Sequence, residues 1–203
     1  MTIVPLFPTM IFHWDADSFK ENKDELLKYC YAERKKDPQG VVISNSGGWQ
    51  SGSGHHEESI IYSFLRKQVG DFLTSTRAFR DGVGVEFSNM WININQKRDY
   101  NIVHNHPKST LSGVFWIKTP ENSGKLQFMN SNDFIEYSFL KCLQPCVNDK
   151  YFTHLRFQMD LVPGRIVLFP SHLLHGVQPN QSREDRISIS FNIHLTEPEE
   201  DED

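Results

Sequence analysis

Three histidines and one arginine are the side chains best suited to chemistry in this chain. His104 and His106 are separated by one residue, and His175 follows the apolar, strand-like run of residues 165–169. Because strand side chains alternate in direction, an extended His-x-His segment places both imidazoles on one face, where they can bind one metal ion. Three neutral imidazoles suit iron, zinc, copper or nickel far better than magnesium or calcium. The sequence therefore predicts a metal site formed by His104, His106 and His175.

Two other residues compete for a place in this site. His172 lies three residues before His175, directly after Pro170-Ser171, and this sequence indicates a loop. Asp99 offers a carboxylate, but it belongs to the turn-like segment 97–100. We therefore favour His175 over His172, and the three histidines over a set that includes Asp99.

Arg186 is the basic residue expected to face the same cavity. It starts a strand-like run eleven residues after His175, across a turn sequence. We predict that the two residues lie nearly opposite each other in a hairpin, with Ser188 at the next inward position. A buried guanidinium needs an anionic partner, and its geometry suits a carboxylate bound in two-point contact. The alternative is a structural ion pair with one of the nearby acids, namely Glu184, Asp185 or Asp160.

Length and composition fit one globular domain. The chain has 203 residues, of which 38% are hydrophobic and 23% charged, values that are ordinary for a globular protein. The formal net charge is −5, but it is concentrated in the terminal run Glu197-Pro198-Glu199-Glu200-Asp201-Glu202-Asp203. We predict a single domain over residues 1–196 and a disordered acidic tail over residues 197–203.

Partners and location follow from the distribution of charge and apolar residues. Lys and Arg are scattered rather than striped, which argues against nucleic-acid binding. No apolar run approaches the ~20 residues of a membrane span, and the first residues lack the pattern of a secretory signal. We therefore expect a cytoplasmic protein that binds neither nucleic acid nor membranes. The odd number of cysteines indicates free thiols, and Pro145 between Cys142 and Cys146 indicates a loop there.

Hydrophobic periodicity predicts two helices followed by strands. Apolar residues at helical spacing indicate helices over about residues 17–36 and 57–76. From residue 83 onward the pattern alternates as in strands, with Gly, Pro, Asn and Asp between the runs. The expected strands cover residues 3–14, 41–43, 83–95, 112–118, 125–129, 151–161, 165–169 and 187–195.

This order of elements favours two helices packed outside a C-terminal antiparallel β-sandwich or barrel. Many short strands without helices between them argue against a parallel α/β sheet. The Gly-rich segment 44–54 is either a lid over the site or a connection whose Trp49 packs in the core. The first strand contains two prolines, which suits a sheet edge. It can pair with the barrel or with a second subunit, so a homodimer stays open.

Several strings of residues resemble the iron(II)/2-oxoglutarate-dependent dioxygenases. Within that superfamily the chain is most similar to a group of 2-oxoglutarate–iron oxygenases known from marine bacteria and their phages. The strings are Trp91-Ile92-Asn93-Ile94-Asn95, His104-Asn105-His106-Pro107, Leu111-Ser112-Gly113-Val114-Phe115-Trp116 and the block from Pro163 to His175, with an earlier likeness at Gly47-Gly48-Trp49-Gln50-Ser51. The resemblance is most specific over about half of the chain. It implies a mainly β protein with flanking helices, built on a double-stranded β-helix (cupin-like jelly roll).

The resemblance also implies roles for individual residues. His104 and His175 match the first and the distal ligand histidine of the iron site. Arg186 matches the residue that binds the 5-carboxylate of 2-oxoglutarate, and Ser188 completes an Arg-x-Ser pattern. Fe(II) and 2-oxoglutarate are therefore the expected cofactor and cosubstrate.

Three further residues need separate treatment. Asn93 and Asn95 lie on the strand before the first ligand, where related oxygenases place polar groups that contact the cosubstrate. Cross-strand hydrogen bonding is the alternative for both. His106 departs from the usual His-x-Asp pattern of the superfamily. An imidazole there keeps three facial positions open but removes one negative charge, which should strengthen attraction to the dianionic cosubstrate.

The resemblance implies an Fe(II)/2-oxoglutarate-dependent dioxygenase. Such an enzyme would hydroxylate an unidentified substrate while converting 2-oxoglutarate to succinate and carbon dioxide. Two alternatives stay open. One is a three-histidine, cupin-like metalloenzyme that does not use 2-oxoglutarate, in which Arg186 binds the carboxylate of the substrate itself. The other is a non-catalytic jelly roll that binds a metal or ligand as an assembly module.

Overall fold

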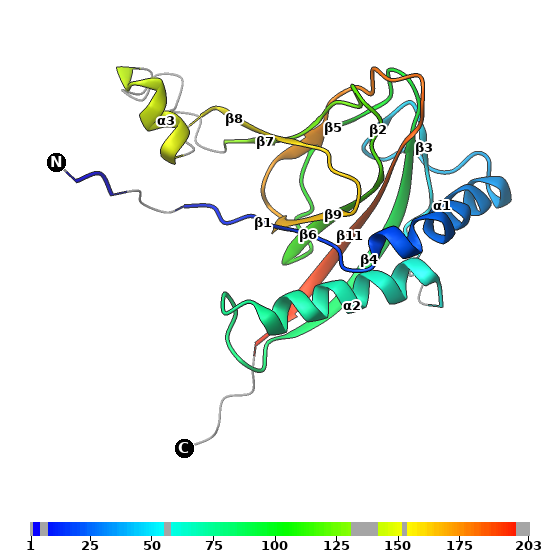
Figure 1. The fold of residues 1–203 in the computed structure, drawn as a ribbon, viewed down its shortest axis with the longest axis horizontal. Coiled ribbons are helices and arrows are strands. Elements are labelled where there is room, and N and C mark those ends of the chain that lie inside the picture. Colours follow the sequence, from blue (N-terminus) through cyan, green and yellow to red (C-terminus); the bar gives the residue numbers. More distant parts are fainter. Residues whose placement is uncertain (1, 5–7, 55–57, 131–141, 152–153, 198–203) are drawn as a thin grey trace.

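Two antiparallel sheets face each other in this chain (Figure 1). The computed structural model describes residues 2–4, 8–54, 58–130, 142–151 and 154–197. Apart from Glu197, the predicted acidic tail lies outside these described residues. The mainly β architecture with flanking helices agrees with the fold class expected from the sequence.

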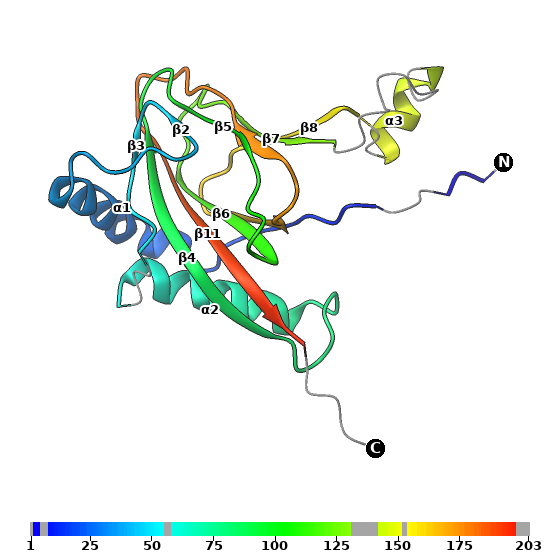
Figure 2. The ribbon, with the colours of Figure 1, turned by 180° about the vertical axis from the view of Figure 1, so that it is seen from behind.

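Two long helices cover one side of the molecule. They are α1 (Phe19–Lys36) and α2 (Ile60–Ser75), and they begin and end within three residues of the predicted helices. Figures 1 and 2 show both helices beside the sheet that contains β4 and β11, on the side away from β5 and β10. Their buried residues join one apolar cluster with the outward side chains of that sheet.

The larger sheet has six strands, in the order β1-β9-β6-β11-β4-β3. They are β1 (Phe12–Asp15), β9 (Arg165–Pro170), β6 (Leu111–Lys118), β11 (Arg186–Thr196), β4 (Gly84–Asn95) and β3 (Trp49–Gln50). β1 pairs with β9 and forms the edge of the sheet, as predicted. It is shorter than the predicted range of 3–14, where Pro8 lacks the N–H that a ladder needs.

The smaller sheet has five strands, in the order β2-β5-β10-β7-β8. They are β2 (Asn45–Ser46), β5 (Tyr100–His104), β10 (His175–Val177), β7 (Lys125–Met129) and β8 (Arg156–Asp160). β7 and β8 extend away from the barrel towards α3 (Pro145–Tyr151), as Figure 1 shows. The predicted loop at Cys146 is therefore wrong: Pro145 starts a short helix, a position where its missing N–H costs nothing.

Alternation along β11 separates an apolar face from a polar one. Its odd-numbered residues pack against the helices and include Ile187, Ile189, Phe191 and Ile193. Its even-numbered residues point between the two sheets and include Arg186, Ser188, Ser190 and Asn192. A second apolar cluster, from β6, β7, β9 and β10, fills the remaining space between the sheets. The inner face of β11 is thus the polar wall of an otherwise apolar interior.

The Gly-rich segment forms part of both sheets. The predicted strand at residues 41–43 is wrong, since Val42 and Ile43 are exposed and β2 and β3 follow later. Trp49 is 4% exposed, and its indole N–H donates to the carbonyl of Asp37 (2.7 Å). Of the two interpretations of this segment, the connection with a core tryptophan describes the structure.

We expect Gly113→Ala to destabilise the protein. A Cβ at Gly113 would lie 2.2 Å from the ring of Phe191, which is fully buried, and overpacking a core costs about 1–3 kcal/mol. Gly70 in α2 is the matched control, because a Cβ there would meet no described atom within 4 Å beyond its own helix backbone. Gly70→Ala should raise stability by about 0.5–1 kcal/mol. Urea unfolding of both variants measures the difference, and equal midpoints would contradict the prediction.

Candidate metal centre

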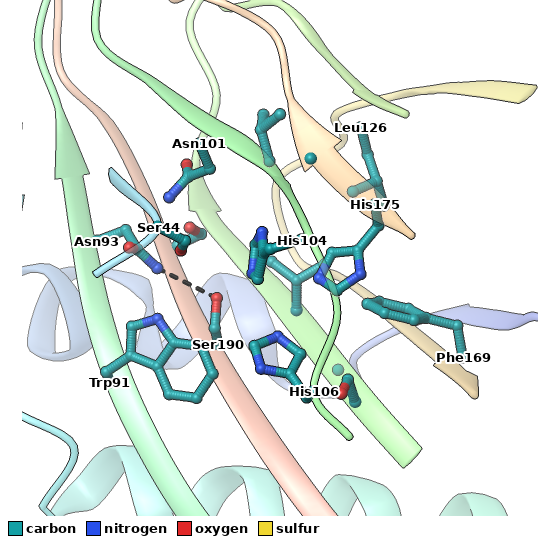
Figure 3. Close-up of a pocket in the computed structure, with 16 residues that line it drawn as sticks. Ser44, Trp91, Asn93, Asn101, His104, His106, Leu126, Phe169, His175 and Ser190 are labelled. Atoms are coloured by element: carbon teal, nitrogen blue, oxygen red, sulfur yellow. Dashed lines mark hydrogen bonds between the residues drawn. The ribbon is translucent and has the colours of Figure 1, made fainter. Parts of the chain in front are cut away.

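The three predicted ligand histidines lie together between the sheets. His104 ends β5 and His175 begins β10, and these two residues are directly paired across the strands. His106 follows β5, where its backbone N–H donates to the carbonyl of Ser171 (2.8 Å). The ring centroids are 4.5 to 5.2 Å apart, and the ligand nitrogens all lie within 4.8 Å of one another. Figure 3 shows the three rings converging on one cavity.

A β-bulge in β5 turns His104 towards this cavity. Between the pairs His175–His104 and Val177–Asn101, β10 advances two residues while β5 advances three. Without the extra residue, Asn101 and His104 would point to opposite faces, because strand side chains alternate. With it, both line the same cavity. Bulges often redirect a side chain in this way beside functional sites.

Two of the three imidazoles have a fixed orientation. Nδ1 of His104 lies 2.7 Å from the carbonyl oxygen of Ile102, and Nδ1 of His175 lies 2.8 Å from that of Leu173. A carbonyl only accepts, so each Nδ1 carries the proton and each Nε2 keeps its lone pair for a ligand. His106 differs: among the described residues, its ring contacts are with other rings, including Trp91 at 5.5 Å between centroids.

Burial keeps all three imidazoles neutral. It lowers the pKa of His175 to about 3, with a smaller contribution from the neighbouring His104. It lowers the pKa of His106 to about 4 in the same way, and the pKa of His104 also falls. Neutral imidazoles are the form that binds a metal, so at neutral pH no proton has to leave first.

The cavity around the histidines has one polar and one apolar side. Figure 3 shows Asn93, Ser44 and Ser190 across the cavity from Phe169. The apolar walls include Val114, Leu126, Phe169 and Val177. Apart from the three neutral imidazoles, the described residues that line the cavity are polar but uncharged or apolar.

Arg186 lies at the next inward position of β11 beyond Ser188, which lines the cavity. It is fully buried. Its Nη1 donates to the carbonyls of Ser123 (2.6 Å) and Gln178 (2.7 Å), whereas its Nε and Nη2 have no hydrogen-bond partner among the described residues. Burial lowers the pKa of Arg186 to about 10, against a smaller opposing effect of the carboxylate of Asp99. The guanidinium therefore stays charged at neutral pH with half of its fork unpaired.

The acids considered as ion-pair partners of Arg186 make other contacts. Glu184 pairs with Lys118 (2.9 Å) and Asp160 with Lys125 (3.0 Å). The carboxylate of Asp185 accepts from the hydroxyl of Tyr31 (3.1 Å). Among the described residues, none of these three acids is ion-paired with the guanidinium, whose free edge has the geometry to bind an anion.

The predicted hairpin between His175 and Arg186 is wrong. β10 pairs with β5 and β7, and β11 pairs with β4 and β6, so the two residues lie in different sheets. The ten residues between them cross from one sheet to the other instead of turning back. Arg186 nevertheless faces inwards, because the alternation of side chains along β11 does not depend on which strand pairs with it.

The two asparagines lie opposite inward residues of β11. Asn93 is paired with Ser188, lines the cavity, and donates from Nδ2 to Oγ of Ser190 (3.1 Å). Asn95 is paired with Arg186 and is 1% exposed. Within the described ranges, the side-chain carbonyl oxygens of both asparagines lack a hydrogen-bond partner.

The competing ligands lie elsewhere. His172 is exposed. The carboxylate of Asp99 accepts from the backbone N–H of Gln96 (2.7 Å), within its own turn. The structure also adds cavity residues that sequence reasoning missed, namely Ser44, Asn101 and Ser190. Extending the alternation of β11 by one step would have found Ser190, whereas the bulge in β5 hides Asn101.

Solved structures share this fold over most of the chain. A prolyl-4-hydroxylase from Pseudomonas putida is 13% identical with a TM-score of 0.61, over 92% of this chain and 94% of that one. A prolyl hydroxylase from Trichoplax adhaerens, in complex with a hypoxia inducible factor peptide fragment, is 13% identical with a TM-score of 0.62, over 91% and 83%. HygX from Streptomyces hygroscopicus, with nickel and 2-oxoglutarate bound, is 11% identical with a TM-score of 0.58, over 92% and 82%. At these identities, the likeness establishes the double-stranded β-helix fold.

Sequence comparison adds the family. No curated protein matches the chain, and no helix within the described ranges is long and apolar enough to cross a membrane. One family model matches residues 89–192, just over half of the chain, from β4 to β11. The matched segment contains the three histidines and Arg186. The chain therefore belongs to the family described as "Putative 2OG-Fe(II) oxygenase", oxidoreductases that use Fe(II) and 2-oxoglutarate.

Proposed function

We propose that this enzyme converts 2-oxoglutarate to succinate and carbon dioxide while it hydroxylates a second substrate. His104, His106 and His175 bind the Fe(II), and Arg186 with Ser188 binds the 5-carboxylate of 2-oxoglutarate. The observation that carries the proposal is the half-paired guanidinium of Arg186, buried beside the cavity that contains the histidines.

The donor set suits Fe(II). Three neutral imidazoles are good ligands for divalent iron, and a facial set of three leaves positions for other ligands. Bonds from the backbone carbonyls fix the rings of His104 and His175, as outer hydrogen bonds usually do in metal sites. The bound iron supplies the oxidative chemistry, and the protein binds and orients the reactants.

The free edge of Arg186 suits a carboxylate. Nε and Nη2 form one side of the guanidinium fork, and two parallel N–H donors match two carboxylate oxygens. Ser123 and Gln178 hold the opposite corner through their carbonyls, so the fork has little freedom to turn. Without an anion, this buried charge is poorly compensated. Binding of the cosubstrate would therefore satisfy donors that folding alone leaves unpaired.

Asn93 and Asn95 can present N–H groups to the cosubstrate. 2-Oxoglutarate offers only acceptor oxygens at neutral pH, so it needs donors around it. A half-turn of the Asn93 amide would let the Ser190 hydroxyl donate to Oδ1 and would turn Nδ2 towards the ligand. The serine can do this because a hydroxyl both donates and accepts. Asn95 lies opposite Arg186, and a half-turn of its amide would put Nδ2 where the unpaired Oδ1 now lies, as a donor for the 5-carboxylate.

Without an acidic ligand, the occupied site keeps one positive charge. Three neutral imidazoles leave the divalent iron with its full charge, so the iron and Arg186 together carry three positive charges against the two negative charges of 2-oxoglutarate. The phenyl ring of Phe169 lies 4.5 Å from the His175 ring, and with Leu126 and Val114 it keeps water from that side of the site. In such a poorly hydrated site the attraction between metal and cosubstrate is strong.

Other features predicted from the sequence stay predictions. They are the cytoplasmic location, the single domain over residues 1–196 and the homodimer, for which the outer edge of β1 remains the candidate contact.

Replacing Arg186 tests the cosubstrate site. We expect Arg186→Met to weaken 2-oxoglutarate binding at least ~30-fold, because removing one side of a buried charge pair costs about 2–5 kcal/mol. Calorimetry with the Ni(II)-loaded protein measures binding, and succinate formation with Fe(II) and ascorbate measures turnover. Lys118→Met is the control, since it removes an equal charge from an exposed ion pair. Unchanged binding in Arg186→Met would favour the alternative in which Arg186 holds the carboxylate of the substrate itself.

Replacing His106 tests whether the charge of the residue at this position changes the affinity for 2-oxoglutarate. His106→Asp and His106→Asn differ in charge but hardly in shape. We expect the aspartate variant to bind 2-oxoglutarate at least about fivefold more weakly than the asparagine variant, because even in water two unit charges 4 Å apart interact by ~1 kcal/mol. The affinities come from titrating each Co(II)-loaded protein and following its visible absorption. Equal affinities would show that the ligand charge does not reach the cosubstrate.

The buried imidazoles should make the metal-free protein sensitive to acid. In the unfolded chain these histidines take up protons near pH 6.5, whereas His106 and His175 stay neutral in the folded chain down to about pH 4 and 3. The unfolded state therefore binds more protons below pH 6.5, and stability falls as the pH falls. Each imidazole contributes up to about 1.4 kcal/mol per pH unit.

Urea unfolding with a chelator present, between pH 6.5 and 4.5, measures this slope. His175→Gln should reduce it, whereas the same change at the exposed His172 should not. Equal slopes for wild type and His175→Gln would contradict the prediction.

A further inference from the structure

A chain of buried polar side chains connects the larger sheet to the loop that carries His106. Oγ of Ser171 lies 2.8 Å from Oγ of Ser112, and Oγ of Ser112 lies 2.6 Å from Oδ1 of Asn192. Nδ2 of Asn192 then donates to Oδ1 of Asn89 (2.7 Å). Ser171, Ser112 and Asn192 are each at most 3% exposed.

Chemistry fixes the direction of every bond in this chain. A side-chain carbonyl only accepts, so the Ser112 hydroxyl donates its single proton to Asn192. Ser112 must then accept from Ser171, whose own proton is used in that bond. Asn192 uses its NH₂ group on Asn89. Each link thus determines the next, and each of the three buried side chains is satisfied.

Ser171 joins this chain to both segments that carry ligand histidines. Its carbonyl accepts from the backbone N–H of His106 (2.8 Å), and its own N–H donates to the carbonyl of Thr110 (3.1 Å). These two bonds hold both ends of the loop between β5 and β6. Ser171 also lies four residues before His175, in the turn that leads into β10.

His106 is the ligand candidate that most needs such support. The rings of His104 and His175 are held by carbonyls, whereas the described residues offer the His106 ring only aromatic contacts. Its orientation therefore depends on where its backbone lies. The backbone bond to Ser171 sets that position, and the polar chain sets the position of Ser171.

We infer that Ser112 and Asn192 are positioning residues for the metal site, acting on His106 through Ser171. This inference rests on the proposed role of His106 as a ligand. Polar side chains on inward strand positions lower stability unless all their groups are paired. An apolar residue at Ser112 would fill the same space without that requirement. A role in positioning the loop that carries His106 explains why polar side chains occupy these positions and why all of them are paired.

A double-mutant cycle with Co(II) tests the inference. Co(II) affinity of the full-length protein is measured by competition with a coloured chelator. We expect Ser112→Ala to lower it about tenfold, the lower end of the usual effect of outer-shell changes. In a His106→Ala background the same change should have no further effect, because the ligand that it positions is gone. In a His104→Ala background it should still cost about tenfold.

Two further variants support the cycle. Ser171→Ala removes the first donor of the chain but keeps both backbone bonds, so it should reproduce the loss if Ser112→Ala does not fold. Ser88→Ala is the matched control, since this hydroxyl contacts only the backbone carbonyl of Asn192 (3.2 Å) among the described residues, and it should leave Co(II) affinity unchanged.

The outcomes separate the inference from the proposed function. Equal losses from Ser112→Ala in wild type and in His106→Ala would overturn the inference, because the serine would then act on general stability. Unchanged affinity in Ser112→Ala would also overturn it. If His106→Ala itself leaves Co(II) affinity unchanged, the proposed metal site fails, and the inference fails with it.

Discussion

A charged guanidinium inside a protein needs hydrogen-bond acceptors for its N–H groups. The arrangement of this site depends on how the N–H groups of Arg186 are paired. Two backbone carbonyls accept hydrogen bonds from one of its nitrogens, Nη1. They can approach because Gly124 has a φ of +85° and packs against the carbonyl of Gln178, which a Cβ would meet at 2.7 Å. The cradle therefore needs glycine at this turn. It also leaves the other edge of the guanidinium for a ligand, so the fold itself creates the demand for an anion.

The inner face of β11 organises the rest of the interior. Its four inward residues, Arg186, Ser188, Ser190 and Asn192, are polar, whereas the alternate residues are apolar. The first is the residue proposed to bind the cosubstrate, the middle two line the histidine cavity, and the last belongs to the polar chain that leads to the loop of His106. On this proposal, one strand provides the cosubstrate-binding residue, a wall of the histidine cavity and the support of the His106 loop.

Sequence patterns predicted the parts of this arrangement that depend on local alternation. β7 was predicted with its observed bounds, and β6, β9 and β11 to within a residue, because their apolar periodicity is regular. β10 and the bulge in β5 have no such signal. β10 has three residues, and pairing with two neighbours rather than its own composition makes it a strand. The hairpin prediction failed for the same reason, since the turn sequence after His175 does not show which sheet the chain enters next.

The site residues were easier to predict than their surroundings. His104, His106, His175 and Arg186 have side chains whose chemistry is informative wherever they lie, and the resemblance implied the roles that are proposed for them. Ser112 and Asn192 are ordinary residues whose importance depends on partners up to 103 residues away along the chain. Sequence alone cannot reveal such a chain of bonds, because each link exists only once the sheets have paired.

The two halves of the site belong to different sheets, and this division constrains how the enzyme can work. The smaller sheet and its loops carry the three histidines, while the larger sheet carries Arg186 and its neighbours. A ligand that binds both the metal and the guanidinium must therefore bridge the sheets. Its fit depends on their separation, which is set by the apolar cluster between them. The packing of this cluster, together with the polar chain from Asn192 to Ser171, would therefore fix the distance that such a ligand has to span.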